Sequence, residues 1–93
     1  MSQLSAASQP KLRAGCRISE SAQQGDVLLI PEGVLRLVGP GKKILERCDG
    51  VRNVSKIIRD LQAEFPAVDP ARIETEVNAF LERLHQKGVL DIG

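Results

Sequence analysis

The sequence is poor in aromatic residues, cysteine and histidine. Its 93 residues contain two phenylalanines, Phe65 and Phe80, and no tryptophan or tyrosine. The core must therefore be aliphatic and thin. The two cysteines and single histidine show no CxxC, HxxxH or HExxH spacing, and a zinc site needs three or four nitrogen or sulfur ligands. We expect no metal and no cofactor. Two cysteines also fall short of the disulfide framework of a small secreted domain, which favours a cytoplasmic protein.

Neither sign of charge predominates, and long apolar runs are absent. Thirteen basic residues face twelve acidic ones, which leaves a net charge of +1. A nucleic-acid-binding domain usually carries a clear basic excess, so we expect no nucleic-acid partner. No apolar run approaches the roughly 18 residues that cross a bilayer, and the N-terminus lacks the charged-then-apolar pattern of a signal peptide. We expect no membrane partner.

Composition divides the chain into a tail and one domain. Residues 1–15 are rich in Ser, Ala and Gln, contain Pro10 and Gly15, and show no periodicity. We predict a flexible N-terminal tail there. Residues 16–93 are long enough for one small domain.

Alternating and β-branched runs predict three strands, over residues 16–20, 27–30 and 34–38. Turn residues separate them. In the third strand, Leu35 and Leu37 point to one face, and the other face carries Val34, Arg36 and Val38.

Helical patterns follow the strands. A short helix is predicted over residues 40–48, with Gly50 ending it. Asn53 is a predicted N-cap for a second helix that Pro66 closes. Asp69 followed by Pro70 opens a third helix in the preferred order of cap and proline. We therefore predict three strands followed by three helices.

The stretch "ILERCDG" (residues 44–50) allows two interpretations. Ile44 and Cys48 are four residues apart on one helix face, so both can enter the core, and Cys packs as a small hydrophobe. Alternatively, Cys48 is a nucleophile that a nearby base activates. His85 is the only histidine available as that base, and no third group is visible to orient it. The pattern favours the helix end.

Three runs in order, "LLIPEGVLRL", "ILERCDGVRNVSKIIRDLQAEFP" and "VNAFLERLHQKGVL", resemble the pyrroloquinoline quinone (PQQ) biosynthesis protein D (PqqD) family. The resemblance covers residues 27–90. One departure lies at "LVGPGKK", where the family usually shows an Asn and a Ser or Ala as a helix cap. This sequence has Val38, Gly39 and Gly41 there, which affects the expected start of the first helix.

The resemblance implies an α+β, winged-helix-like domain, with a three-stranded antiparallel sheet followed by three helices and no catalysis of its own. Family members bind a ribosomally made precursor peptide, PqqA. They present it to a radical S-adenosylmethionine (SAM) enzyme, PqqE, which joins a Glu to a Tyr side chain. In related peptide recognition elements the leader peptide adds a strand to the third β-strand and packs against the third helix.

Carried onto this chain, the resemblance predicts a peptide site with two walls. Strand addition needs an exposed backbone edge and pockets for alternate side chains, and the strand wall comprises Val34, Leu35, Arg36, Leu37 and Val38. The helix wall comprises Ile73, Val77 and Leu81, with the Leu81 edge open and Phe80 in the core. Arg36 offers a partner to an acidic residue of the peptide. The alternatives are an ordinary edge strand and a helix stripe that is all core.

Two other functions compete with peptide binding. Three helices beside a sheet suit a winged-helix DNA-binding protein, although the third helix mixes Arg72, Arg83 and Lys87 with three glutamates. A small thiol enzyme would use Cys48 or Cys16. For the peptide binder, apolar residues exposed in a groove allow dimers at high concentration, and we predict a monomer as the working form.

Overall fold

The structure is a computed structural model that describes residues 4–92. The elements in those residues are β1 (Pro10–Leu12), β2 (Arg17–Ser21), β3 (Gly25–Ile30), β4 (Gly33–Arg36), α1 (Gly41–Glu46), α2 (Val54–Glu64), α3 (Pro70–Gln86) and β5 (Leu90–Ile92). None of the helices in this part of the chain combines the length and apolar composition needed to cross a membrane.

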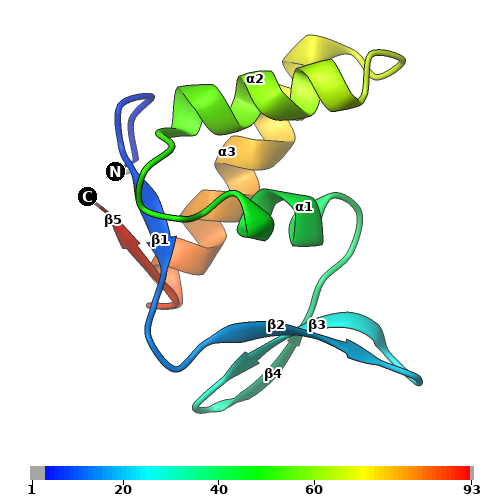
Figure 1. Cartoon of the computed structure of the whole chain (residues 1–93), viewed down its shortest axis with the longest axis vertical. Helices are drawn as coiled ribbons and strands as arrows, with labels where there is room; N and C mark the ends of the chain where they lie inside the picture. The colour runs from blue at the N-terminus through cyan, green and yellow to red at the C-terminus, as the bar shows by residue number, and fades with distance from the viewer. Residues whose placement is uncertain (1–3, 93) are drawn as a thin grey trace.

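The sheet of β2, β3 and β4 is antiparallel, with β3 in the middle. Ile18, Leu28 and Leu35 lie opposite one another across the three strands. They face the helices, which all lie on one side of the sheet (Figure 1). The predicted three-stranded antiparallel sheet followed by three helices is confirmed.

The caps of the two long helices are those that the sequence predicts. Asn53 Oδ1 accepts a hydrogen bond from the backbone N–H of Lys56 at 2.8 Å. Asp69 Oδ1 accepts one from the backbone N–H of Ala71 at 3.1 Å, with Pro70 as the first helical residue. Each cap satisfies an N–H of the first turn that has no partner within the helix.

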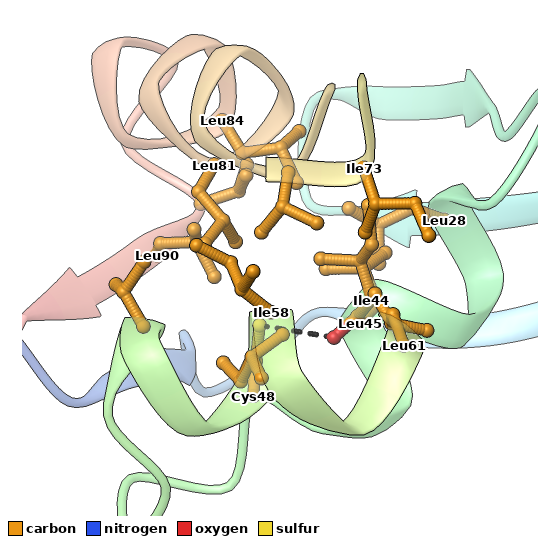
Figure 2. Packing of buried hydrophobic residues seen from close by; sticks show 14 residues of the cluster. Leu28, Ile44, Leu45, Cys48, Ile58, Leu61, Ile73, Leu81, Leu84 and Leu90 are labelled. Atoms are coloured by element: carbon orange, nitrogen blue, oxygen red, sulfur yellow. Dashed lines mark hydrogen bonds between the residues drawn. The ribbon is translucent and has the colours of Figure 1, made fainter. Parts of the chain in front are cut away.

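The core is an aliphatic cluster between the sheet and the helices. Figure 2 shows side chains from all three helices packed between Leu28 of β3 and Leu90 of β5. The two phenylalanines lie at its border, partly buried. The sequence-based expectation of an aliphatic core is therefore correct.

The flexible tail predicted over residues 1–15 is wrong for most of its length. Residues 1–3 lie outside the described residues, but β1 pairs with β5, and Pro10 is fully buried. The two strands run side by side near both chain ends (Figure 1). The carbonyls of Ala6 and Ser8 also accept hydrogen bonds from the N–H groups of Ser55 and Val54. The segment therefore caps α2, which a local pattern does not reveal.

Candidate functional site

Strand β4 has a free edge. Within residues 4–92 its one neighbour in the sheet is β3, with Leu35 opposite Leu28 and Arg36 opposite Val27. The N–H of Leu37 donates to the carbonyl of Asp26 at 2.9 Å, which continues the same register. Backbone groups alternate in direction along an antiparallel strand. The N–H and C=O groups of Val34 and Arg36 therefore point away from β3, and the predicted open edge is present.

The two faces of this strand differ as the alternation predicts. Leu35 and Leu37 are half-buried and pack against the core cluster. The opposite face is open to solvent, with Val34 52% and Val38 65% exposed and Arg36 also exposed. A chain added at the edge would have one row of side chains turned toward the helices and one row toward solvent.

A hollow of about 660 Å³ lies where β4 leads into α1, and α3 forms one of its walls. Its apolar lining comes from several elements, and comprises Pro40, Leu61, Phe65, Val68, Ile73 and Val77. Charged side chains surround this lining, and comprise Asp26, Lys42, Lys43, Glu46, Arg72 and Glu76. A concave apolar surface with a charged rim fits apolar side chains of a ligand.

The helix wall differs from the prediction at two residues. Ile73 and Val77 are buried and line the floor of the hollow. Leu81 is 0% exposed and belongs to the core, so the expectation that its edge stays open is wrong. Phe80, which the stripe pattern assigned to the core, is half-buried at the border of α3. The side of α3 that stays partly open therefore carries Phe80, and Leu81 lies on the enclosed side.

Phe80 explains why α1 begins with a glycine. A Cβ on Gly41 would lie 3.2 Å from two atoms of the Phe80 ring and 3.6 Å from Cβ of Leu37. The ring therefore lies against the first turn of α1, beside the residue that follows β4. Helix α1 starts after Pro40 without a side-chain cap. The departure of this sequence from the usual family cap thus coincides with a close contact between α1 and α3.

Cys48 has the environment of a core residue. It is 5% exposed, and its Sγ donates to the carbonyl of Ile44 at 3.4 Å (Figure 2). Burial, with a smaller contribution from Asp49, raises the pKa of the thiol to about 12. A reactive cysteine needs the opposite shift. Within residues 4–92, no group of three His, Cys, Asp or Glu side chains is placed to hold a metal ion.

Comparison with known proteins finds one family. The family model for coenzyme PQQ synthesis protein D (PqqD) matches residues 26–90. The chain is 42% identical over 91 residues to a PqqA binding protein of Xanthomonas euvesicatoria pv. vesicatoria, covering 97% of this chain and 98% of that one. It is 39% identical over 83 residues to a PqqA binding protein of Stutzerimonas stutzeri, covering 88% of each.

Two solved structures share the fold. One is the solution structure of the PqqD truncation of Methylobacterium extorquens PqqCD, described as a functional, stand-alone recognition element for ribosomally synthesized and post-translationally modified peptides. It matches with a TM-score of 0.81 at 32% identity over 97% of this chain and 96% of that one. The crystal structure of PqqD from Xanthomonas campestris matches with a TM-score of 0.60 at 37% identity over 86% and 89%.

Proposed function

This chain belongs to the coenzyme PQQ synthesis protein D (PqqD) family, and from that premise we propose that it is a peptide chaperone of pyrroloquinoline quinone biosynthesis. Its relatives in Xanthomonas and Stutzerimonas are named PqqA binding proteins, and in this proposal the chain binds the same precursor peptide, PqqA. The observation that carries the mechanism is the free edge of β4 in the described residues, together with an apolar hollow that the chain reaches at Gly39 and Pro40 just after this strand.

The peptide docks by strand addition. Its backbone forms hydrogen bonds with the outward N–H and C=O groups of Val34 and Arg36, which β3 leaves unused. Main-chain bonds supply affinity for any extended peptide, and side-chain pockets supply selectivity. Arg36 also lies within reach of an acidic side chain in the solvent-facing row of the bound peptide.

The second row of peptide side chains turns inward. At the level of Leu37 it meets Phe80, and further along it enters the hollow over Ile73 and Val77. Of the helix residues predicted as a wall, these two retain that role, Phe80 is added, and Leu81 supports them from the core.

The protein acts by presentation, with the chemistry on another protein. The modifying enzyme is the radical SAM enzyme PqqE, which receives the peptide while this domain holds its leader. A buried thiol whose pKa is about 12 offers no nucleophile. In this proposal the working form is a monomer, because a second copy paired at β4 would occupy the peptide edge.

The test is a proline on the free edge. Proline removes an N–H, so Arg36→Pro deletes an outward donor and leaves the bonds that Leu35 and Leu37 form with β3. We expect an amide-shift titration with synthetic PqqA to saturate for the unaltered protein and to show at least about tenfold weaker binding for the variant.

The matched control puts the same residue on the far edge of the sheet. The register of β2 and β3 turns the backbone of Glu20 away from β3, so Glu20→Pro removes an outward donor of β2. It should lower PqqA affinity much less than Arg36→Pro does, because it leaves the edge of β4 intact and the rim contact that it removes is the exposed ion pair of Glu20 with Lys42. Equal affinity of a folded Arg36→Pro variant and the unaltered protein would reject strand addition at β4.

A further inference from the structure

The peptide path proposed above, called the groove below, runs beside β4 from the hollow past Phe80 toward the C-terminal end of α3. Arg13 joins this helix end to the rest of the chain, because its backbone N–H donates to Val89 O at 3.0 Å and its Nη1 donates to Gly88 O at 3.1 Å. Two residues further on, a Cβ on Gly15 would lie 3.7 Å from Pro31, in the turn between β3 and β4. The end of α3 and the start of β4 therefore lie at the same end of the groove.

This end of the groove carries cations without carboxylate partners. Arg83 places its guanidinium 5.9 Å from the centre of the Phe80 ring, so it lies over the side chain that packs against Gly41. Lys87 follows seven residues after Phe80, about 10 Å along the helix and on nearly the same side. Among the described residues, no carboxylate lies within 4 Å of the charged groups of Arg13, Arg83 or Lys87. Glu32, in the turn before β4, is exposed.

The opposite end of the groove is already neutralised. Lys42 pairs with Glu20 at 3.1 Å and lies 3.7 Å from Asp26, and Arg72 pairs with Glu76 at 3.2 Å. Apart from Arg36 on β4, a ligand that spans the groove therefore meets paired charges around the hollow and unpaired cations near the end of α3. Such a gradient favours one charge pattern in the ligand and disfavours its reverse.

We propose that Arg83 and Lys87 are specificity residues that recognise acidic side chains of the bound peptide at the C-terminal end of α3. The inference rests on the proposed function, because it concerns a second feature of the same peptide. Backbone pairing at β4 accepts many sequences. The cations add a preference for a segment that places Glu or Asp beside Phe80 and beyond it. They also set the register, since a one-residue slip turns each acidic side chain to the other face.

The experiment measures PqqA affinity by calorimetry for the full chain and three variants. Arg83→Glu and Lys87→Glu reverse the charge at exposed positions, and Arg59→Glu makes the same change on α2, beside a second hollow on the other side of α3. At about 50 mM salt we expect each α3 variant to bind about five- to tenfold more weakly, and the difference to shrink at about 500 mM salt as screening increases. Arg59→Glu should match the unaltered protein.

A second peptide separates charge recognition from any change in the helix. In this peptide every Glu and Asp of PqqA is replaced by Gln or Asn. The unaltered protein should bind it more weakly than PqqA, and the α3 variants should bind it within about twofold of the unaltered protein, because the charge that they sense is gone. Equal PqqA affinities for Arg83→Glu, Lys87→Glu and the unaltered protein would overturn this inference alone. No binding of PqqA by the unaltered protein would overturn the proposed function with it.

Discussion

At the scale of single residues, Cys48 is a packing residue of the core. Its sulfur lies in the aliphatic cluster and bonds to the preceding helical turn. The thiol therefore remains protonated far above neutral pH, which suits packing and prevents nucleophilic attack. Of the two interpretations of "ILERCDG", the structure supports a packed core cysteine. The prediction that Gly50 ends the helix is wrong, because α1 ends at Glu46 with Arg47 as its C-cap, and Gly50, with a φ of 80°, lies in the loop that follows.

The raised pKa of the Cys48 thiol predicts that folding stability falls at alkaline pH. The ordinary value is 9.0 and the folded value is about 12, so between these pH values the unfolded chain loses a proton that the folded chain keeps. Folding stability is fully present below pH 9 and falls as pH rises toward the folded value. Cys48→Ala should cost about 1–2 kcal/mol at neutral pH through lost packing. It should also make the alkaline fall in stability shallower.

Urea unfolding at a series of pH values measures both effects. Cys16→Ala, at a partly exposed position, is the control. It should change little in either the stability at neutral pH or the fall in stability at alkaline pH. If the free energy of unfolding fell equally steeply above pH 9 in Cys48→Ala and in the unaltered protein, Cys48 would not be the cause of the alkaline loss. Loss of PqqA binding in a folded Cys48→Ala variant would revive a functional role for the thiol.

At the scale of elements, the N-terminal segment is part of the fold. It supplies β1 and buries Pro10, and its carbonyls accept hydrogen bonds from the backbone N–H groups at the start of α2. We expect removal of residues 1–12 to lower the free energy of unfolding by on the order of 3 kcal/mol, from lost apolar burial and unsatisfied backbone groups. Urea unfolding followed by circular dichroism measures this loss. A deletion that leaves the midpoint unchanged would mean that the segment contributes nothing to stability.

Elements with local signals could be predicted from the sequence, and elements that depend on distant partners could not. Asn53 and Asp69 act on N–H groups within their own first turns, so the starts of α2 and α3 follow from short patterns. The three residues of β1 have no period of their own, and they become a strand because β5 pairs with them near the other chain end. No local sequence pattern predicts a pairing between segments so far apart in the chain.

The site shows the same division. The alternation over residues 34–38 correctly separates the half-buried side chains from the exposed ones, because the period of a strand is local. On α3 the stripe identifies which residues are apolar but not how far the helix is rotated toward its neighbours. The contact of Phe80 with Gly41 sets that rotation, so the open side carries Phe80 and Leu81 is enclosed.

At the scale of the whole molecule, charged residues divide between stability and binding. Asp60 on α2 lies 3.0 Å from Lys56 Nζ, 3.4 Å from Arg52 Nε and 3.9 Å from Arg47 Nε, so it links α2 to the C-cap of α1 and to the loop that follows. The cations of this network have carboxylate partners, whereas Arg83 and Lys87 have none among the residues that the structure describes. Compensated charge supports the fold, and uncompensated charge remains for a ligand.

This division predicts opposite effects of two charge changes. The hydrogen bond from Lys56, with the nearby Lys56, Arg52 and Arg47 charges, lowers the pKa of Asp60, so its stabilisation is present above the ordinary carboxyl range and is lost as pH falls through the lowered folded pKa. Asp60→Asn should therefore reduce the urea midpoint at about pH 7 and have little effect near about pH 2. Its PqqA affinity should be normal, because Asp60 lies outside the groove. Arg83→Glu should weaken binding with little change in the urea midpoint. If Asp60→Asn weakened binding as much as Arg83→Glu does, the two roles would not be separable in this fold.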